Sequence, residues 1–231
     1  MAIILNIETS TDICSVCIAK DGQVLAIRET ERSYSHSEVI AIFINECKAE
    51  AGIKITDLDA VAISQGPGSY TALRIAAATA KGICYSCDIP LISISTMKAL
   101  ANSLKDQCKD RDVILSMIDA RRMEVYYSVY NNELYNITPV APHILTKDSF
   151  LEYNNYSRIL FCGDGVAKAK EILAVTNGEF LSIECSSLHM ISLSEEKYGK
   201  KLFEDIAYYE PLYYKSPNIT VQKKNILKRG I

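Results

Sequence analysis

The stretch SQGPGSYTALRIAAATAKGICYSC, residues 64–87, is the key to the rest of the chain. It follows an apolar run, and the glycine-proline-glycine turn at 66–68 leads into a segment that we expect to be a long helix. Ser69 is suited to cap that helix, because its hydroxyl can accept a hydrogen bond from a free N–H group of the first turn. A strand, a turn and a helix start in this order direct backbone N–H groups at one point, which suits an anion.

The predicted helix is unusual in its small side chains. Ala72, Ala76 and Ala80 recur at every fourth position, and Gly82 lies beside them. Such a face lets another helix approach closely, but it buries little apolar area alone. The helix therefore needs a neighbour, which either the same chain or a partner supplies.

The composition is typical of a globular protein in a reducing compartment. The 231 residues are 48% hydrophobic and 23% charged, with a net charge of −3. No apolar run reaches the roughly 20 residues of a membrane-spanning helix, and the start MAIILNIETS lacks the basic segment of a signal peptide. We therefore expect a cytoplasmic protein without a membrane contact, whose 8 cysteines are reduced thiols.

The order of the predicted elements repeats along the chain. Apolar strands at 3–7 and 113–118 each open a three-strand meander that is followed by alternating helices and strands. This repetition favours a duplicated α/β fold over a single doubly wound sheet. We place the boundary in the charged stretch near 108–112, which gives an N-terminal part, 1–109, and a C-terminal part, 110–231.

Several local features of the C-terminal part are predicted less directly. We expect Pro139 and Pro142 to lie in a loop, a short helix over 146–153 and a final helix over 188–203. The chain ends in a basic tail, which is either a solvated terminus or a contact to a phosphate backbone. Its basic residues are Lys215, Lys223, Lys224, Lys228 and Arg229.

Acidic residues close the first strand of each half. In α/β sheets ligands collect at the carboxyl ends of strands. Glu8, Asp12 and Asp119 could therefore face one cleft and hold a magnesium–nucleotide complex through water. The alternative is that these short side chains only end strands and cap turns. The Gly-Asp-Gly turn at 163–165 is similarly either a nucleotide contact or an ordinary turn.

Other motifs favour neither a metal site nor a nucleophile. The Cys-x-x-Cys pairs at 14/17 and 84/87 lack convergent partners for zinc, and Cys14 and Cys17 fall on opposite faces of a predicted strand. The chain has no His pair at metal-ligand spacing, no Walker loop and no Gly-x-Ser-x-Gly elbow. A peptidase or another self-sufficient hydrolase is therefore poorly supported.

Three motifs together resemble one family. ETSTDICSVCI (8–18), SQGPGSYTALRIAAATAKGI (64–83) and DARRMEVY (119–126) are similar in order and spacing to the TsaB family, also called YeaZ, which is paralogous to TsaD. The resemblance covers nearly the whole chain. It implies an actin-like fold (ASKHA, sugar kinase/Hsp70-type, ribonuclease H-like) with two subdomains. It also implies a role in forming N6-threonylcarbamoyladenosine (t6A) at position 37 of tRNAs that read ANN codons.

The resemblance implies a subunit and not a catalyst. In this family TsaD transfers the threonylcarbamoyl group, TsaB binds and activates TsaD as a heterodimer, and the ATPase TsaE joins them. The resemblance implies that the chain has no cofactor or metal of its own and that any ATP or ADP binds at the complex interface. It also implies that the chain contacts tRNA only through the complex. A homodimer is the implied alternative when TsaD is absent.

The family's partner contact lies on the small-residue helix and on the helix before it. The implied interface residues are Val39, Ile42, Phe43, Glu46, Tyr70, Thr71, Leu73, Arg74, Ala77, Ala78 and Lys81. The candidate nucleotide site, vestigial in this interpretation, comprises Glu8, Thr9, Asp12, Asp119, Gly163 and Gly165. The family usually has glycine where this chain has Ala72 and Ala76. The two added methyl groups leave open how closely a partner's helix can cross this helix. An ATP-dependent transferase that uses the acidic cleft is the alternative function.

Overall fold

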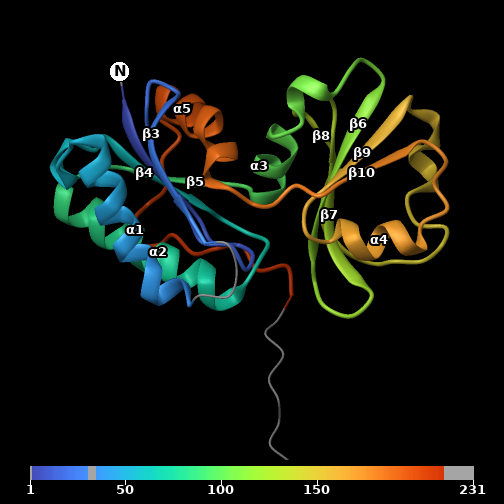
Figure 1. Cartoon of the computed structure of the whole chain (residues 1–231), viewed down its shortest axis with the longest axis horizontal. Helices are drawn as coiled ribbons and strands as arrows, with labels where there is room; N and C mark the ends of the chain where they lie inside the picture. The colour runs from blue at the N-terminus through green and yellow to red at the C-terminus, as the bar shows by residue number, and fades with distance from the viewer. Residues whose placement is uncertain (1, 31–34, 216–231) are drawn as a thin grey trace, which may run out of the picture.

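The computed structural model describes residues 2–30 and 35–215, and Figure 1 shows two lobes that are each built on one sheet. The first sheet comprises β1 (Ile3–Glu8), β2 (Ser15–Lys20), β3 (Gln23–Glu29), β4 (Ala60–Ser64) and β5 (Leu91–Ile94). The second comprises β6 (Asp112–Asp119), β7 (Glu124–Tyr130), β8 (Asn136–Ile144), β9 (Arg158–Cys162) and β10 (Gly178–Leu181). The helices are α1 (His36–Ala51), α2 (Tyr70–Cys87), α3 (Thr96–Asn102), α4 (Val166–Ile172) and α5 (Ile191–Gly199).

The two sheets have the same strand order. It is β3-β2-β1-β4-β5 in the first and, counted from the opposite edge, β8-β7-β6-β9-β10 in the second. In each, an antiparallel meander is extended by two strands that run parallel to its first strand. This repeated order confirms the predicted duplicated α/β fold of the actin-like type.

The central strand β1 is buried on both faces, which explains its continuous apolar sequence. Successive side chains point to opposite faces of a sheet. Leu5 and Ile7 pack against α1 and α2, whereas Ile4 belongs to a core that both lobes share. That shared core is built around Met97 and Leu100 of α3, which lies between the two sheets in Figure 1.

Some local elements differ from the sequence prediction. β8 runs through Pro139 and Pro142, which were expected in a loop. Proline cannot donate to a strand ladder, but β8 is an edge strand, so one side of it needs no partner. The helix predicted over 146–153 is only a 3₁₀ segment, Leu151–Asn155. The final predicted helix, 188–203, is shorter, because a 3₁₀ turn at Ser187–Met190 precedes α5.

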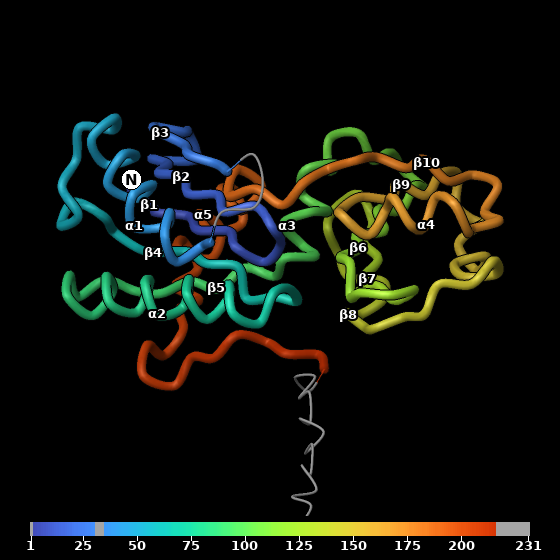
Figure 2. Tube along the Cα trace, turned by 60° about the horizontal axis from the view of Figure 1, so that its bottom comes forward, coloured from blue at the N-terminus to red at the C-terminus, as the bar shows by residue number. Residues whose placement is uncertain are grey.

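After β10 the chain returns to the first lobe. Helix α5 packs against β5 and β1, and residues 203–215, here called the strap, continue below α2 in Figure 2. Glu204 pairs with Leu91 at the edge of the first sheet, and the Tyr209 side chain is buried in the core under α1 and α2. The predicted division at 109/110 thus assigns to the C-terminal part a segment that lies on the first lobe.

Among the described residues, no helix combines the length and the apolar character that crossing a bilayer requires.

Candidate functional site

The small face of α2 packs inside the chain. Ala76, Ala77 and Ala80 lie in one apolar core with Ile40 and Ile44 of α1 and with the first sheet. The spacing of the alanines therefore serves close packing of α2 on its own sheet and on α1. The sequence left open whether the small face of this helix packs against the same chain or against a partner. For Ala76, Ala77 and Ala80 it packs against the same chain.

The outer face of α1 and α2 carries most of the predicted interface residues. Leu73 and Ala77 are exceptions, because they are buried in the first lobe. Val39, Phe43 and Lys81 are half-buried. The remaining six, Ile42, Glu46, Tyr70, Thr71, Arg74 and Ala78, are exposed, and 53% of Ile42 is accessible to solvent. The surface available to a partner therefore consists of these six residues and the edges of the three half-buried ones; we call it the α1–α2 face.

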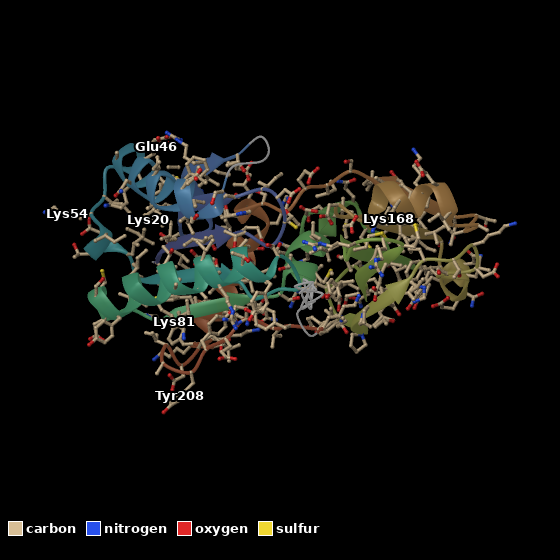
Figure 3. The ribbon with its side chains drawn as sticks, turned by 90° about the horizontal axis from the view of Figure 1, so that it is seen from below. Lys20, Glu46, Lys54, Lys81, Lys168 and Tyr208 are labelled. Atoms are coloured by element: carbon tan, nitrogen blue, oxygen red, sulfur yellow. The ribbon has the colours of Figure 1, made fainter. Side chains whose placement is uncertain are left out.

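The strap already contacts part of the α1–α2 face. The Arg74 Nε donates to the Tyr213 hydroxyl at 3.1 Å, and the Arg74 guanidinium lies 4.4 Å from the centre of the Tyr70 ring. The Lys81 Nζ donates to the carbonyl oxygen of Ala207 at 3.3 Å, and Figure 3 shows Lys81 beside Tyr208 of the strap. The sequence did not predict this contact, because the segment from about residue 204 onward shows no periodicity that could place it.

Glu46 of the α1–α2 face is paired within the chain. The Arg28 Nε lies 2.9 Å from Glu46 Oε2, and Arg28 Nη1 lies 2.7 Å from Glu50 Oε2. Both glutamates are exposed and Arg28 is only half-buried, so each pair contributes little to stability. Glu46 is therefore held in place by Arg28 but stays accessible.

A second candidate site is the cleft between the lobes, with a volume of about 770 Å³. Asp12 of the first lobe and Asp119 of the second line it, together with Asp164. Hydroxyl groups and four tyrosines complete the wall. The lining residues are Ser10, Thr11, Asp12, Pro67, Gly68, Ser69, Tyr70, Thr71, Ile118, Asp119, Ala120, Arg121, Tyr126, Asp164, Leu212, Tyr213, Tyr214 and Lys215.

Glu8 does not join these carboxylates in the cleft. Its side chain is buried, Oε1 accepts a hydrogen bond from the Ser10 N–H at 2.7 Å, and Oε2 has no partner among the described residues. Burial raises the pKa of Glu8, and the hydrogen bonds from Ser10 and Ser64 only partly offset it. Thr9 is also buried, and its hydroxyl donates to the Ala72 carbonyl at 3.1 Å. Both residues therefore support the end of β1, and neither lines the cleft.

The acidic residues that do line the cleft interact with one another. Asp119 Oδ1 lies 2.8 Å from the Lys168 Nζ, while the Asp119 N–H donates to Asp164 Oδ1 at 2.8 Å. Desolvation and the charges of Asp119, Glu184 and Asp12 raise the pKa of Asp164 to about 6. Within residues 2–30 and 35–215, no three His, Cys, Asp or Glu side chains are arranged to hold a metal ion.

The glycine turns are filled by the chain's own backbone. A Cβ on Gly68 would lie 2.3 Å from the Ser10 carbonyl oxygen, and one on Gly163 would lie 2.0 Å from that of Met117. A Cβ on Gly165 would lie 3.0 Å from the Val125 side chain. These glycines therefore let each turn pack closely on a neighbouring strand end, while Gly68 also forms part of the cleft wall.

One N–H group of the anion cradle predicted at the start of α2 is used within the chain. The Ser69 N–H donates to the Ser10 carbonyl at 2.7 Å. Ser69 occupies the N-cap position, but its hydroxyl makes no capping hydrogen bond, contrary to prediction. Cys14 and Cys17 pack in different cores, which confirms that they point to opposite faces.

Replacing Glu8 with glutamine is expected to stabilise the protein at pH 7.5 by about 1 kcal/mol, because a buried charge is removed while the acceptor for Ser10 remains. The folded-state pKa of Glu8 lies above the ordinary 4.5, so wild-type stability should rise as the pH falls through that pKa towards 4.5. Glu8→Gln should lack the part of this rise in stability that comes from protonation of Glu8.

Urea unfolding at pH 7.5 and 5.5 measures both effects. Glu171→Gln, at an exposed position of α4, serves as the matched control and should resemble wild type at both pH values. A Glu8→Gln protein that is less stable than wild type at pH 7.5, with the same pH dependence, would show that Glu8 is stabilised in its charged form.

Comparison with known proteins supports one family. The sequence model described as "TsaD: tRNA N6-adenosine threonylcarbamoyltransferase" matches residues 28–209. The "tRNA threonylcarbamoyladenosine biosynthesis protein TsaB" of Haemophilus influenzae is 35% identical over 125 residues, which are 54% of this chain and 52% of that protein. The protein of the same name in Escherichia coli is 33% identical over 130 residues, 56% of this chain and 55% of the relative. The chain thus matches about half the length of these relatives.

Solved structures share the fold. The "YeaZ from Pseudomonas aeruginosa" superposes with a TM-score of 0.77 at 21% identity, covering 92% of this chain and all of that one. A second structure from Pseudomonas aeruginosa, titled as similar to peptidase YEAZ, has a TM-score of 0.82 at 20% identity and covers 93% of this chain. Since the family model spans most of the chain and the curated relatives carry the TsaB name, the chain belongs to the family that the TsaD model describes and, within it, to the TsaB (YeaZ) group.

Proposed function

We propose that the chain is a non-catalytic subunit in the formation of t6A in tRNA and that it binds TsaD through the α1–α2 face. The supporting observation is that face itself, which exposes Ile42, Tyr70 and Arg74 above a well-packed support. Tyrosine and arginine are enriched among the residues that dominate binding energy at interfaces, and an exposed isoleucine gains by burial. A stable complex would bury roughly 1,200–2,000 Å² in total.

The roles of the partners and the tRNA substrates in this proposal rest on the resemblance to the TsaB family. TsaD carries out the transfer, TsaE joins the pair, and tRNAs that read ANN codons are the substrates of the complex. The chain brings no cofactor of its own, and any ATP or ADP binds at the seam with a partner. We place the complex in the cytoplasm, where tRNA is modified, and we propose a homodimer through the same face when TsaD is absent.

Reconstitution tests the proposal directly. With threonylcarbamoyl adenylate as the donor, AMP as the leaving group and TsaE present, TsaD from the same cell should modify tRNA several-fold faster when this chain is added, while the chain with donor and tRNA but without TsaD should give no t6A by mass spectrometry of tRNA nucleosides. An equal rate with and without the chain, at concentrations where the two proteins co-purify, would contradict a role in activation.

The alternative function, an ATP-dependent transferase, predicts binding in the cleft. Titration of Mg-ATP into the chain without TsaD should give no saturable heat, because Glu8 is buried outside the cleft wall and Asp119 is already paired with Lys168. Saturable heat that is lost in Asp12→Asn, an exposed cleft residue, would favour the transferase instead.

A further inference from the structure

Among the described residues, side chains of the two lobes meet in at least two regions. One is the shared apolar core around α3, in which Ile92 of the first sheet and Ile114 of the second both take part. The other is the end of the strap, which lies below α3 in the view of Figure 1. Between these two junctions lies the cleft, and residues 212–215 form part of its wall.

Consecutive residues at the end of the strap contact opposite lobes. The Tyr213 ring lies 4.6 Å from the Tyr70 ring of α2, and its hydroxyl accepts the hydrogen bond from Arg74. The next residue, Tyr214, packs at a ring-centre distance of 6.1 Å against Tyr126 of β7 in the second lobe. The strap thus crosses from one lobe to the other within a single peptide unit.

Lys215 extends the contact to the second lobe. Its Nζ forms an ion pair with Glu124 Oε2 and lies 5.8 Å from the centre of the Tyr126 ring. Glu124 and Tyr126 are both on β7, and Tyr126 lines the cleft. One ion pair and two aromatic contacts therefore hold the end of the strap on the second lobe.

The strap is anchored differently before this point. Ser93 Oγ donates to Glu204 Oε1, the Tyr209 side chain is buried in the first lobe, and the Leu212 N–H donates to the Gln65 carbonyl at 2.8 Å. Residues 204–212 are therefore a fixed part of the first lobe. The contacts of residues 213–215 are exposed or half-buried, and such aromatic and ionic contacts are individually weak. They can break while both sheets stay folded.

We propose that Tyr213, Tyr214 and Lys215 form a clasp that holds the two lobes together across the cleft, with the core around α3 as the hinge. Opening the clasp, by loss of the contacts that Tyr214 and Lys215 make to β7, widens the cleft, while Tyr213 stays on Tyr70 and Arg74 of the first lobe. The clasp is a property of the chain alone, so it does not depend on the proposed binding of TsaD.

The test uses the full chain and the double variant Tyr214→Ala/Lys215→Ala, which removes the contacts to the second lobe. Tyr208→Ala is the matched control, since Tyr208 lies in the same strap and is 85% exposed. Hydrogen–deuterium exchange is followed at the cleft walls, residues 10–12 and 119–122, and at the central strands β1 and β6. Small-angle X-ray scattering gives the radius of gyration.

The clasp predicts a several-fold faster exchange at the cleft walls and a larger radius of gyration in the double variant, with β1 and β6 unchanged and Tyr208→Ala equal to wild type. If the double variant matched Tyr208→Ala in exchange rate and in radius of gyration, the proposal would be overturned. Faster exchange in β1 and β6 would also overturn it, because the removed contacts would then support the fold of the lobes and not only their relative position.

Discussion

Replacing Gly163 with alanine is expected to destabilise the protein by about 3 kcal/mol or more. Gly163 has a φ of +105°, which disfavours any L side chain, and a Cβ there would lie 2.0 Å from the Met117 carbonyl oxygen. The clash is with backbone in the middle of the second sheet, so no side-chain rotation relieves it. In thermal unfolding followed by circular dichroism, the midpoint should fall by about 10 °C.

Gly82→Ala is the control for this prediction. Gly82 is exposed within α2, and nothing lies within 4 Å of the position that its Cβ would take. Alanine is favoured over glycine in a helix by about 1 kcal/mol, so this variant should unfold at a higher temperature than wild type. If Gly163→Ala unfolded at the wild-type temperature, the turn after β9 would have to lie further from Met117 than described, and space for a ligand beside it would be open.

The architecture was predictable because it depends on patterns within short stretches. Continuous apolar runs such as 3–7 indicate strands that are buried on both faces, and the repeated order of elements indicated the duplication. The apolar residues Val39, Ile40, Phe43, Ile44 and Cys47 likewise indicate one face of α1, on which Ile40, Ile44 and Cys47 are buried and Val39 and Phe43 are half-buried. These features are fixed by neighbours along the chain or by burial alone.

The candidate site was less predictable because it depends on contacts between distant segments. A glycine turn at 66–68 has the same sequence whether it faces a phosphate or the backbone of Ser10, and only the packing of β1 beside it decides. The sequence also left open which face of the alanine helix is free. In the structure Ala77 is buried and its neighbour Ala78 is exposed, a difference of one residue that no local pattern resolves.

That difference determines how the proposed interface can be tested. Ala77→Arg would place a charge in the core of the first lobe, and a lost complex would then report only unfolding. Ala78→Arg changes the exposed surface of the same helix and should leave the fold intact. We expect it to weaken TsaD binding at least 100-fold, about 3 kcal/mol, because an arginine at the centre of the contact holds the two surfaces apart.

The matched control is Ala167→Arg, the same substitution at an exposed position of helix α4 in the second lobe. Co-purification with tagged TsaD and the melting temperature are measured for both variants. Both should melt like wild type, and only Ala78→Arg should fail to co-purify. If Ala78→Arg bound TsaD as well as Ala167→Arg did, the partner would have to use another surface, and the exposed Ile42, Tyr70 and Arg74 would need a different explanation. Loss of binding in Ala78→Arg alone would place the contact on α2, since the two variants differ only in the surface that carries the added charge.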